Sequence, residues 1–316
     1  MMENKQDSKL IVSVSPHISS GRTTRGIMLD VIIALIPALI AGSVIFGLRA
    51  LMIVAISVAT CAAGEALFAL ITKRRQTVGD LSAIVTGLIL GLNLPASIGV
   101  FHTIVGSLFA IIVIKCLFGG LGKNFANPAA AARVMMLLAF TDAMTKTGEI
   151  RIVDTVASPT PLAIMKGAAG QLPKITDMLI GLRGGAIGET CAVALVLGGA
   201  YLLIRKVITW HTPIVYIGTV FLLSWLVYRD AGLALYQVLS GGLLIGAIFM
   251  ATDYVTTPTT NLGKAVFALG CGLMTVLIRK LGAYPEGVSF SILFMNLFTN
   301  YIDKLTRKKP LGEVKA

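Results

Sequence analysis

The stretch DTVASPTPL, residues 154–162, places an acid, two prolines and several hydroxyl side chains together in a very apolar chain. A serine or threonine hydroxyl can form a phosphoester, so Thr160 or Ser158 could anchor a phosphate-bearing group. Prolines hold such a segment in a turn or an extended conformation, where a modifying enzyme could reach it. The spacing alone favours a plain turn bounded by prolines.

Three acidic residues could do chemistry inside a membrane. Glu65 lies in the apolar run TCAAGEALFAL, and Asp253 and Glu286 lie in FMATDYVTTPTT and GAYPEGVSF. Ionisable groups at membrane depth are costly and usually functional, so each is a candidate for a sodium or proton path. For Glu65 the alternative is a paired structural acid.

The elements that must position these residues are membrane helices. The chain has 316 residues, of which 56% are hydrophobic and 13% charged, and its mean hydropathy is +0.86. Soluble domains are about 45–50% apolar and about 25% charged. The composition therefore predicts an all-α integral membrane protein with about ten spans, each close to the bilayer thickness. The expected spans are 27–46, 50–71, 81–95, 98–118, 126–140, 187–204, 213–228, 232–250, 264–279 and 288–302.

Lysine and arginine accumulate on the cytoplasmic side of membrane proteins. With a cytoplasmic N-terminus, most of the 27 lysines and arginines fall on that side, although Arg279 and Lys280 oppose this orientation. Both termini are therefore expected in the cytoplasm. The net charge of +12 is interpreted as this orientation signal plus attraction to anionic lipid, because the basic residues are too dispersed to indicate nucleic-acid binding.

The expected spans form two halves of five helices. An odd number of helices in each half requires the halves to be inverted relative to each other. Residues 119–137 can be laid over 279–297, although such matches also arise by chance. The expected parts are a cytoplasmic N-terminal segment (1–26), a first membrane half (27–140), an extracytoplasmic loop (141–186), a second membrane half (187–302) and a cytoplasmic tail (303–316).

Five segments resemble a known family and occur in the family's order along most of the chain. They are FGGLGKNFANPAAAARVM (118–135), DTVASPTPLA (154–163), GLRGGAIGET (181–190), FMATDYVTTPTT (249–260) and GAYPEGVSFSILFMN (282–296). Together they resemble the D subunit of Rnf-type ferredoxin:NAD oxidoreductase complexes and its relative, the B subunit of the sodium-pumping NADH:quinone reductase. The short N-terminal segment favours the Rnf-type subunit.

The resemblance implies a covalent FMN in the extracytoplasmic loop. In the family the final threonine of a short motif bonds to FMN through a phosphoester, and Thr160 matches this position. Asp154 matches the acid read by the flavin transferase. Ala157, Ser158 and Pro159 depart from the usual Ser/Thr, Gly and Ala, and Ser158 is the less favoured acceptor.

The resemblance also implies a second flavin, a non-covalent riboflavin beside KNFANPA. Asn124 and Asn127 would be its contacts, since amides both donate and accept hydrogen bonds. The alternative is that Asn-Pro simply caps and starts a helix. Arg151, Lys166 and Arg183 are candidate partners for the FMN phosphate, although each is more simply a solvated basic residue.

The implied function is the membrane subunit of a redox-driven ion pump in a bacterial or archaeal cytoplasmic membrane. Electrons would pass through the FMN between ferredoxin and NAD with coupled Na⁺ or H⁺ translocation. Partners would be the other Rnf subunits, which carry flavin and iron–sulfur groups and bind NAD and ferredoxin, together with the transferase and lipid. No metal site is indicated. Without the motifs, a secondary transporter or channel is favoured, and a scaffold subunit lacking a cofactor is a third possibility.

Overall fold

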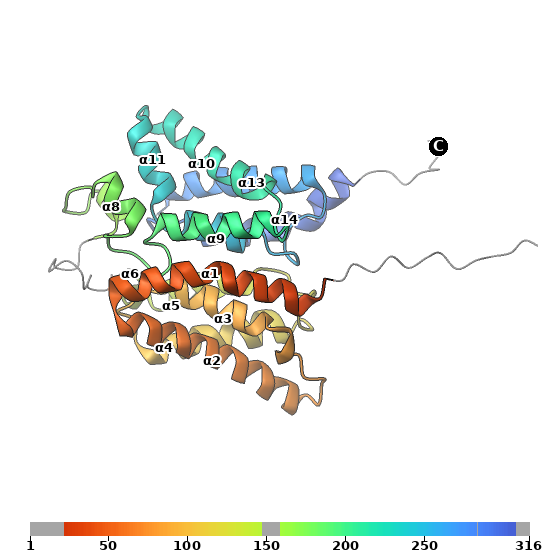
Figure 1. Ribbon diagram of the computed structural model, residues 1–316. Coiled ribbons are helices and arrows are strands. Elements are labelled where there is room, and N and C mark those ends of the chain that lie inside the picture. Colours follow the sequence, from red (N-terminus) through yellow and green to blue (C-terminus); the bar gives the residue numbers. More distant parts are fainter. Residues whose placement is uncertain (1–21, 147–158, 283, 308–316) are drawn as a thin grey trace, which may run out of the picture.

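The computed structural model describes residues 22–146, 159–282 and 284–307, and these form helices and no strands (Figure 1). Asp154, Ser158 and Arg151 lie outside the described residues. The all-α prediction is confirmed for the part of the chain that is described.

The first half of the chain runs from α1 to α6. Its helices are α1 (Thr24–Phe46), α2 (Leu48–Ile71), η1 (Val78–Asp80), α3 (Ser82–Leu92), α4 (Val100–Leu108) continuing as the π-helix η2 (Phe109–Cys116), α5 (Pro128–Ala139) and α6 (Thr141–Thr145). The loop expected over 141–186 thus begins with a helix, and it also contains α7 (Pro161–Met165) and α8 (Ile175–Ile180).

The second half follows this loop. Its helices are α9 (Ala192–Ile204), α10 (His211–Tyr228), α11 (Ala231–Leu239), α12 (Leu243–Ile245) continuing as the π-helix η3 (Gly246–Met250), α13 (Asn261–Leu281) and α14 (Val288–Thr306). Each expected span range overlaps a helix. The range 232–250 is broken, however, because α11 and the α12–η3 segment meet at an angle of 65°.

Four of the described helices, α1, α2, α10 and α13, are long and apolar enough to cross a membrane, and the bent α11–α12–η3 pair would make a fifth. Four further apolar helical segments are shorter, at 10–17 residues. The structure therefore supports a multi-span helical protein, whereas the count of ten remains a prediction.

The two halves lie side by side and meet through α1 and α9, and also through α5 and α14 (Figure 1). Gly198 on α9 allows α9 to approach α1 closely. A Cβ atom added there would overlap the carbonyl oxygen of Ala34 and would lie 3.1 Å from Cζ of Phe249. The backbones of α1 and α9 are therefore in direct contact.

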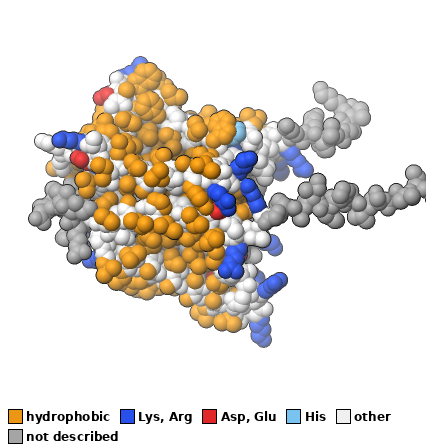
Figure 2. Space-filling view, viewed as in Figure 1, with side chains coloured by type: hydrophobic (Ala, Val, Ile, Leu, Met, Phe, Trp, Pro, Cys, Tyr) orange, Lys and Arg blue, Asp and Glu red, His pale blue; other side chains and the backbone are white. Residues whose placement is uncertain are grey.

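The bundle has two distinct ends. The beginning of α1 and the end of α14 lie together at what we call the terminal end, and α6 and α8 lie at the opposite end, which we call the loop end (Figure 1). Hydrophobic side chains cover the visible face between them, while Lys and Arg gather mainly at the terminal end (Figure 2). This surface suits a bundle surrounded by lipid.

Candidate functional site

Thr160 is placed by the start of α7. Its backbone is extended, its Oγ1 accepts a hydrogen bond from the Ala163 N–H at 3.2 Å, and Pro161 is the first helical residue. A threonine cap followed by proline is a favoured way to begin a helix. The chain is therefore extended at Thr160 and enters a helix at Pro161, which fixes the Thr160 hydroxyl at a half-buried position.

Thr160 lines a cavity at the loop end. About 770 Å³ of empty space, part of it open to solvent, lies between the end of α3, α5, the Thr160 segment and the loop before α14. The polar side chains of its wall include Asn93, Arg133, Thr145 and Glu286.

Arg133 is the centre of an ionic cluster in the wall of this cavity. Its side chain is 5% exposed and forms ion pairs with both Glu189 and Glu286. Its Nη1 also donates to Oδ1 of Asn93 at 2.5 Å. The Glu189 contact is close in distance, but its angles are not those of a hydrogen bond. One guanidinium from the first half therefore holds two carboxylates from the second.

Two other buried arginines bind backbone carbonyls near the end of α11. Arg183 donates to the carbonyls of Leu239 at 2.6 Å and Glu189 at 2.7 Å. Arg279 donates to carbonyls of Gln237 and Ser240. The interpretation of Arg183 as a solvated basic residue is wrong, because the side chain is buried and satisfies carbonyls that the bend after α11 leaves without helical partners. Its pairing with an FMN phosphate stays a prediction.

Lys166 is not a free cation either. Its Nζ donates to the carbonyls of Gly282 at 2.5 Å and Tyr284 at 2.8 Å, and desolvation lowers the pKa of this amine. It therefore fastens the α7 segment to the loop that carries Glu286.

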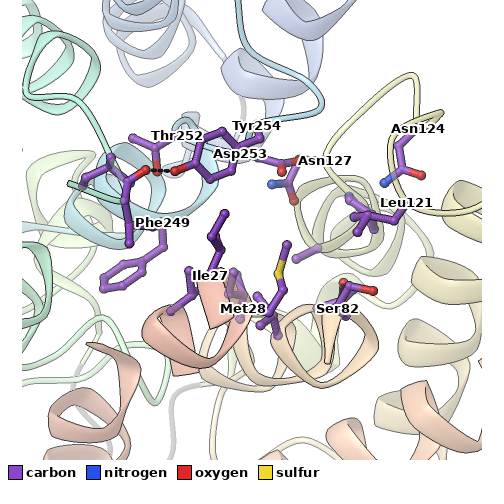
Figure 3. A pocket seen from close by; sticks show the side chains of 18 of the residues that line it. Ile27, Met28, Ser82, Leu121, Asn124, Asn127, Phe249, Thr252, Asp253 and Tyr254 are labelled. Carbon is purple, nitrogen blue, oxygen red and sulfur yellow. Dashed lines mark hydrogen bonds between the residues drawn. The ribbon is translucent and has the colours of Figure 1, made fainter. Parts of the chain in front are cut away.

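A second cavity lies near the terminal end, between the start of α1, α3, η2, the α5 entry and the segment after η3 (Figure 3). It encloses about 720 Å³, again partly open to solvent. The two predicted riboflavin contacts, Asn124 and Asn127, line it together with Lys115 and Asp253.

Asn127 acts as the cap that the alternative interpretation predicted. Its side chain accepts from the Ala130 N–H, while its Nδ2 donates to the Met250 carbonyl at 3.2 Å. Asn124 differs, because it is only 9% exposed and its Oδ1 has no hydrogen-bond partner. Asn124 lies in the wall of this cavity, and a buried amide that lacks a partner is a candidate contact for a hydrogen-bonding ligand.

Glu65 is paired, as the structural alternative proposed. It accepts from Lys115 Nζ at 2.8 Å and from the Thr77 hydroxyl at 2.5 Å, and its side chain is 3% exposed. Lys115 also donates to the Ser82 hydroxyl at 2.6 Å. The sequence analysis does not identify Lys115 as the partner of Glu65. A lysine ending the apolar run FAIIVIKC is the available indication.

Asp253 lies on the opposite wall of the same cavity from Ser82 (Figure 3). Its carboxylate accepts from the Thr256 hydroxyl at 3.2 Å, and burial raises the pKa of this group. Asp253 lines the cavity near the terminal end, and Glu65 is connected to that cavity through Lys115, whereas Glu286 lines the loop-end cavity. The structure does not bring the three predicted ion-path acids together.

The chain also matches a known protein family along almost its whole length. Residues 11–312 match the NQR2, RnfD, RnfE family. The chain belongs to this family. The resemblance inferred from the five segments is therefore confirmed.

Three relatives are similar along their whole length. The D subunit of a Na(+)-translocating ferredoxin:NAD(+) oxidoreductase complex from Acetobacterium woodii is 45% identical over 309 residues, which are 97% of this chain and 96% of the relative. The D subunit of a proton-translocating ferredoxin:NAD(+) oxidoreductase complex from Clostridium ljungdahlii is 40% identical, covering 95% and 96%. The D subunit of an ion-translocating oxidoreductase complex from Alcanivorax borkumensis is 36% identical, covering 96% and 97%.

Proposed function

We propose that this chain is the D-type membrane subunit of an ion-translocating ferredoxin:NAD⁺ oxidoreductase and carries a covalent FMN on Thr160. The observation that carries the proposal is the cavity beside Thr160, in a member of a family whose relatives are named as subunits of such complexes. NAD, ferredoxin and the iron–sulfur groups belong to partner subunits in this proposal.

The residues beside Thr160 fit a phosphate-bearing cofactor. The hydroxyl oxygen is fixed by the helix cap, and Arg133 and Asn93 line the same cavity. Arg133 is paired with Glu189 and Glu286 and also donates to Asn93, so these side chains would form the wall beside the flavin, while the Thr160 hydroxyl would supply the oxygen of the phosphoester. When bound, the flavin would supply the electron-transfer chemistry, while these side chains fix its position and charge environment.

The cavity near the terminal end is the proposed site of a non-covalent riboflavin. The unpartnered Oδ1 of Asn124 would accept a hydrogen bond from the ligand, and Phe249 contributes an aromatic wall. Asn127 keeps its role as a cap and orients the Met250 carbonyl. The two proposed flavin sites thus lie towards opposite ends of the bundle.

We further propose ten membrane-crossing segments in two inverted halves, with both termini cytoplasmic. The common position of the start of α1 and the end of α14 supports this arrangement, as does the gathering of Lys and Arg at that end. Arg279 no longer opposes this orientation, because its side chain is buried and donates to backbone carbonyls.

Glu65, Asp253 and Glu286 remain the proposed ion-path acids. Since similar relatives are named for Na⁺ and for protons, the similarity assigns neither ion.

The test is expression with the flavin transferase, followed by a denaturing gel viewed under ultraviolet light. We expect a fluorescent wild-type band that Thr160→Ala abolishes. Thr145→Ala is the matched control, because Thr145 lines the same cavity yet lies outside the family motif, and its band should stay fluorescent. A dark wild-type band would exclude covalent attachment and favour a scaffold subunit or a cofactor-free transporter.

A further inference from the structure

Four basic residues gather where α2 ends, at the terminal end of the bundle (Figure 1). Lys73, Arg74 and Arg75 follow the last turn of α2, Lys123 lies in the loop after η2, and all four side chains are exposed. We call this cluster the α2 corner. Lys73 has φ +53°, and the Arg74 N–H donates to the Ala69 carbonyl at 2.9 Å. The chain therefore turns back over the end of α2 and presents three charges around it.

The loop after η2 belongs to the same corner. Nη1 of Arg74 donates to the Cys116 carbonyl at 3.5 Å, and its guanidinium lies 5.9 Å from the centre of the Phe68 ring. The Gly119 N–H donates to the same Cys116 carbonyl. A Cβ atom added at Gly119 would lie 2.8 Å from Cδ of Lys123. Arg74 and Lys123 thus contact neighbouring parts of one turn.

The two acids closest to this corner in the sequence do not compensate its charge. Glu65 is buried and pairs with Lys115. Asp80 is half-buried and accepts hydrogen bonds from both the N–H and the hydroxyl of Ser82. No residue of the α2 corner forms an ion pair with another described residue. The corner is therefore a cluster of four uncompensated positive charges, which favours an anionic ligand.

Exposed apolar side chains adjoin the α2 corner. Leu70 and Ile71, in the last turn of α2, are 67% and 73% exposed. The other exposed apolar side chains beside the corner are Leu67, Leu117, Phe118 and Phe125. The rings of Phe118 and Phe125 lie 4.6 Å apart, on either side of Lys123 in the sequence. Basic and aromatic residues at the end of an apolar span are typical of the level of lipid headgroups.

A phospholipid fits both parts of this surface. Its phosphate would lie against the cations and its acyl chains along the apolar side chains, whereas a soluble acidic protein would contact the cations alone. An ethanolamine or choline headgroup carries an ammonium group, which the four cations would repel. We propose that the α2 corner binds an anionic phospholipid whose headgroup has no ammonium group, such as phosphatidylglycerol. The binding requires no flavin and is independent of the proposed function.

The experiment is native mass spectrometry of the full-length chain in detergent, with equal amounts of phosphatidylglycerol and phosphatidylethanolamine. We expect the wild type to retain phosphatidylglycerol preferentially. The triple variant Lys73→Gln/Arg75→Gln/Lys123→Gln should bind it at least about tenfold more weakly, because each basic residue near an anionic lipid surface contributes roughly a fivefold gain. Arg74 is left in place because it also binds a backbone carbonyl.

The matched control is Arg25→Gln/Lys206→Gln/Lys304→Gln. It removes the same charge from exposed residues that are spread over α1, the turn after α9 and α14, and it should keep the wild-type preference. Wild-type affinity in the corner variant overturns the inference. An equal loss in both triple variants also overturns it, because the effect would then come from overall surface charge.

Two measurements on the wild type decide the question even if a variant does not fold. Raising the ionic strength should reduce the preference for phosphatidylglycerol, because salt screens exposed charges. Glycerol 3-phosphate, which has the phosphate without acyl chains, should not displace the lipid. A preference that salt leaves unchanged, no preference at all, or full displacement by glycerol 3-phosphate would each overturn the assignment of this site to a phospholipid.

Discussion

Lys115 is a buried cation whose charge is compensated by neighbouring side chains. It stands near the end of η2, is 1% exposed, and is held by Glu65 and Ser82. π-Helical turns often occur at functional sites because they shift one residue out of the regular helical register. Here the π-helix carries a charged amine into the wall of the cavity near the terminal end.

Replacing Lys115 with methionine should therefore be strongly destabilising. The change leaves Glu65 buried without its cation, which costs about 3–5 kcal/mol when one partner of a buried pair is removed. We expect a lower midpoint of thermal unfolding in detergent. The double variant Lys115→Met/Glu65→Gln removes both charges and should recover much of the loss. A single variant as stable as the wild type would show that the pair is not formed.

At the residue scale, the sequence predicted the roles that depend on local chain geometry. The cap at Asn127 follows from Asn-Pro, whereas the cap at Thr160 was not predicted, because the segment was interpreted as a turn. The free amide oxygen of Asn124 and the shared guanidinium of Arg133 could not be predicted, because each depends on residues far along the chain. From the sequence, position 133 is simply a basic residue inside an expected span.

At the scale of helices, α1 and α9 are joined by a backbone contact at Gly198 that admits no side chain. Gly198→Ala should destabilise the protein, since the new methyl group would overlap the Ala34 carbonyl. The control is Gly218→Ala on α10, where an added Cβ meets nothing within 4 Å. That change should be neutral or stabilising by up to about 1 kcal/mol, because alanine favours helices.

Thermal unfolding of both glycine variants in the same detergent measures the contrast. Opposite signs are expected for the two positions. Equal effects would mean that the α1–α9 crossing is looser than described.

Apolar runs located the helices well, because a span must satisfy its own backbone hydrogen bonds in lipid. They did not reveal the bend at residues 240–242 or the two π-helices. Gly241 has φ +63°, which suits glycine, and its neighbours pack against buried arginines. The bend is thus set by tertiary contacts as well as by the Ser-Gly-Gly sequence.

For the whole molecule, the placement of the two bundle ends gives a direct test of orientation. Lys166 and Lys304 are both exposed. Lys166 follows α7, which borders the loop-end cavity, and Lys304 lies in the last turn of α14, which ends at the terminal end. In intact cells, Lys166→Cys should react with an impermeant thiol reagent, and Lys304→Cys should react only after permeabilisation. The native Cys61, Cys116 and Cys271 are buried, whereas Cys191 is half-buried, so both variants are made in a Cys191→Ser background. The reverse labelling order would invert the proposed topology.

The two cavities approach each other along α3 and α5. On α3, Ile89 lines one and Asn93 the other, and on α5 the corresponding residues are Ala129 and Arg133. Four helical residues span about 6 Å, so the partition between the cavities is roughly one helical turn thick. A group that passes from one cavity to the other therefore has to cross only about one turn of α3 or α5, much less than the thickness of the bundle.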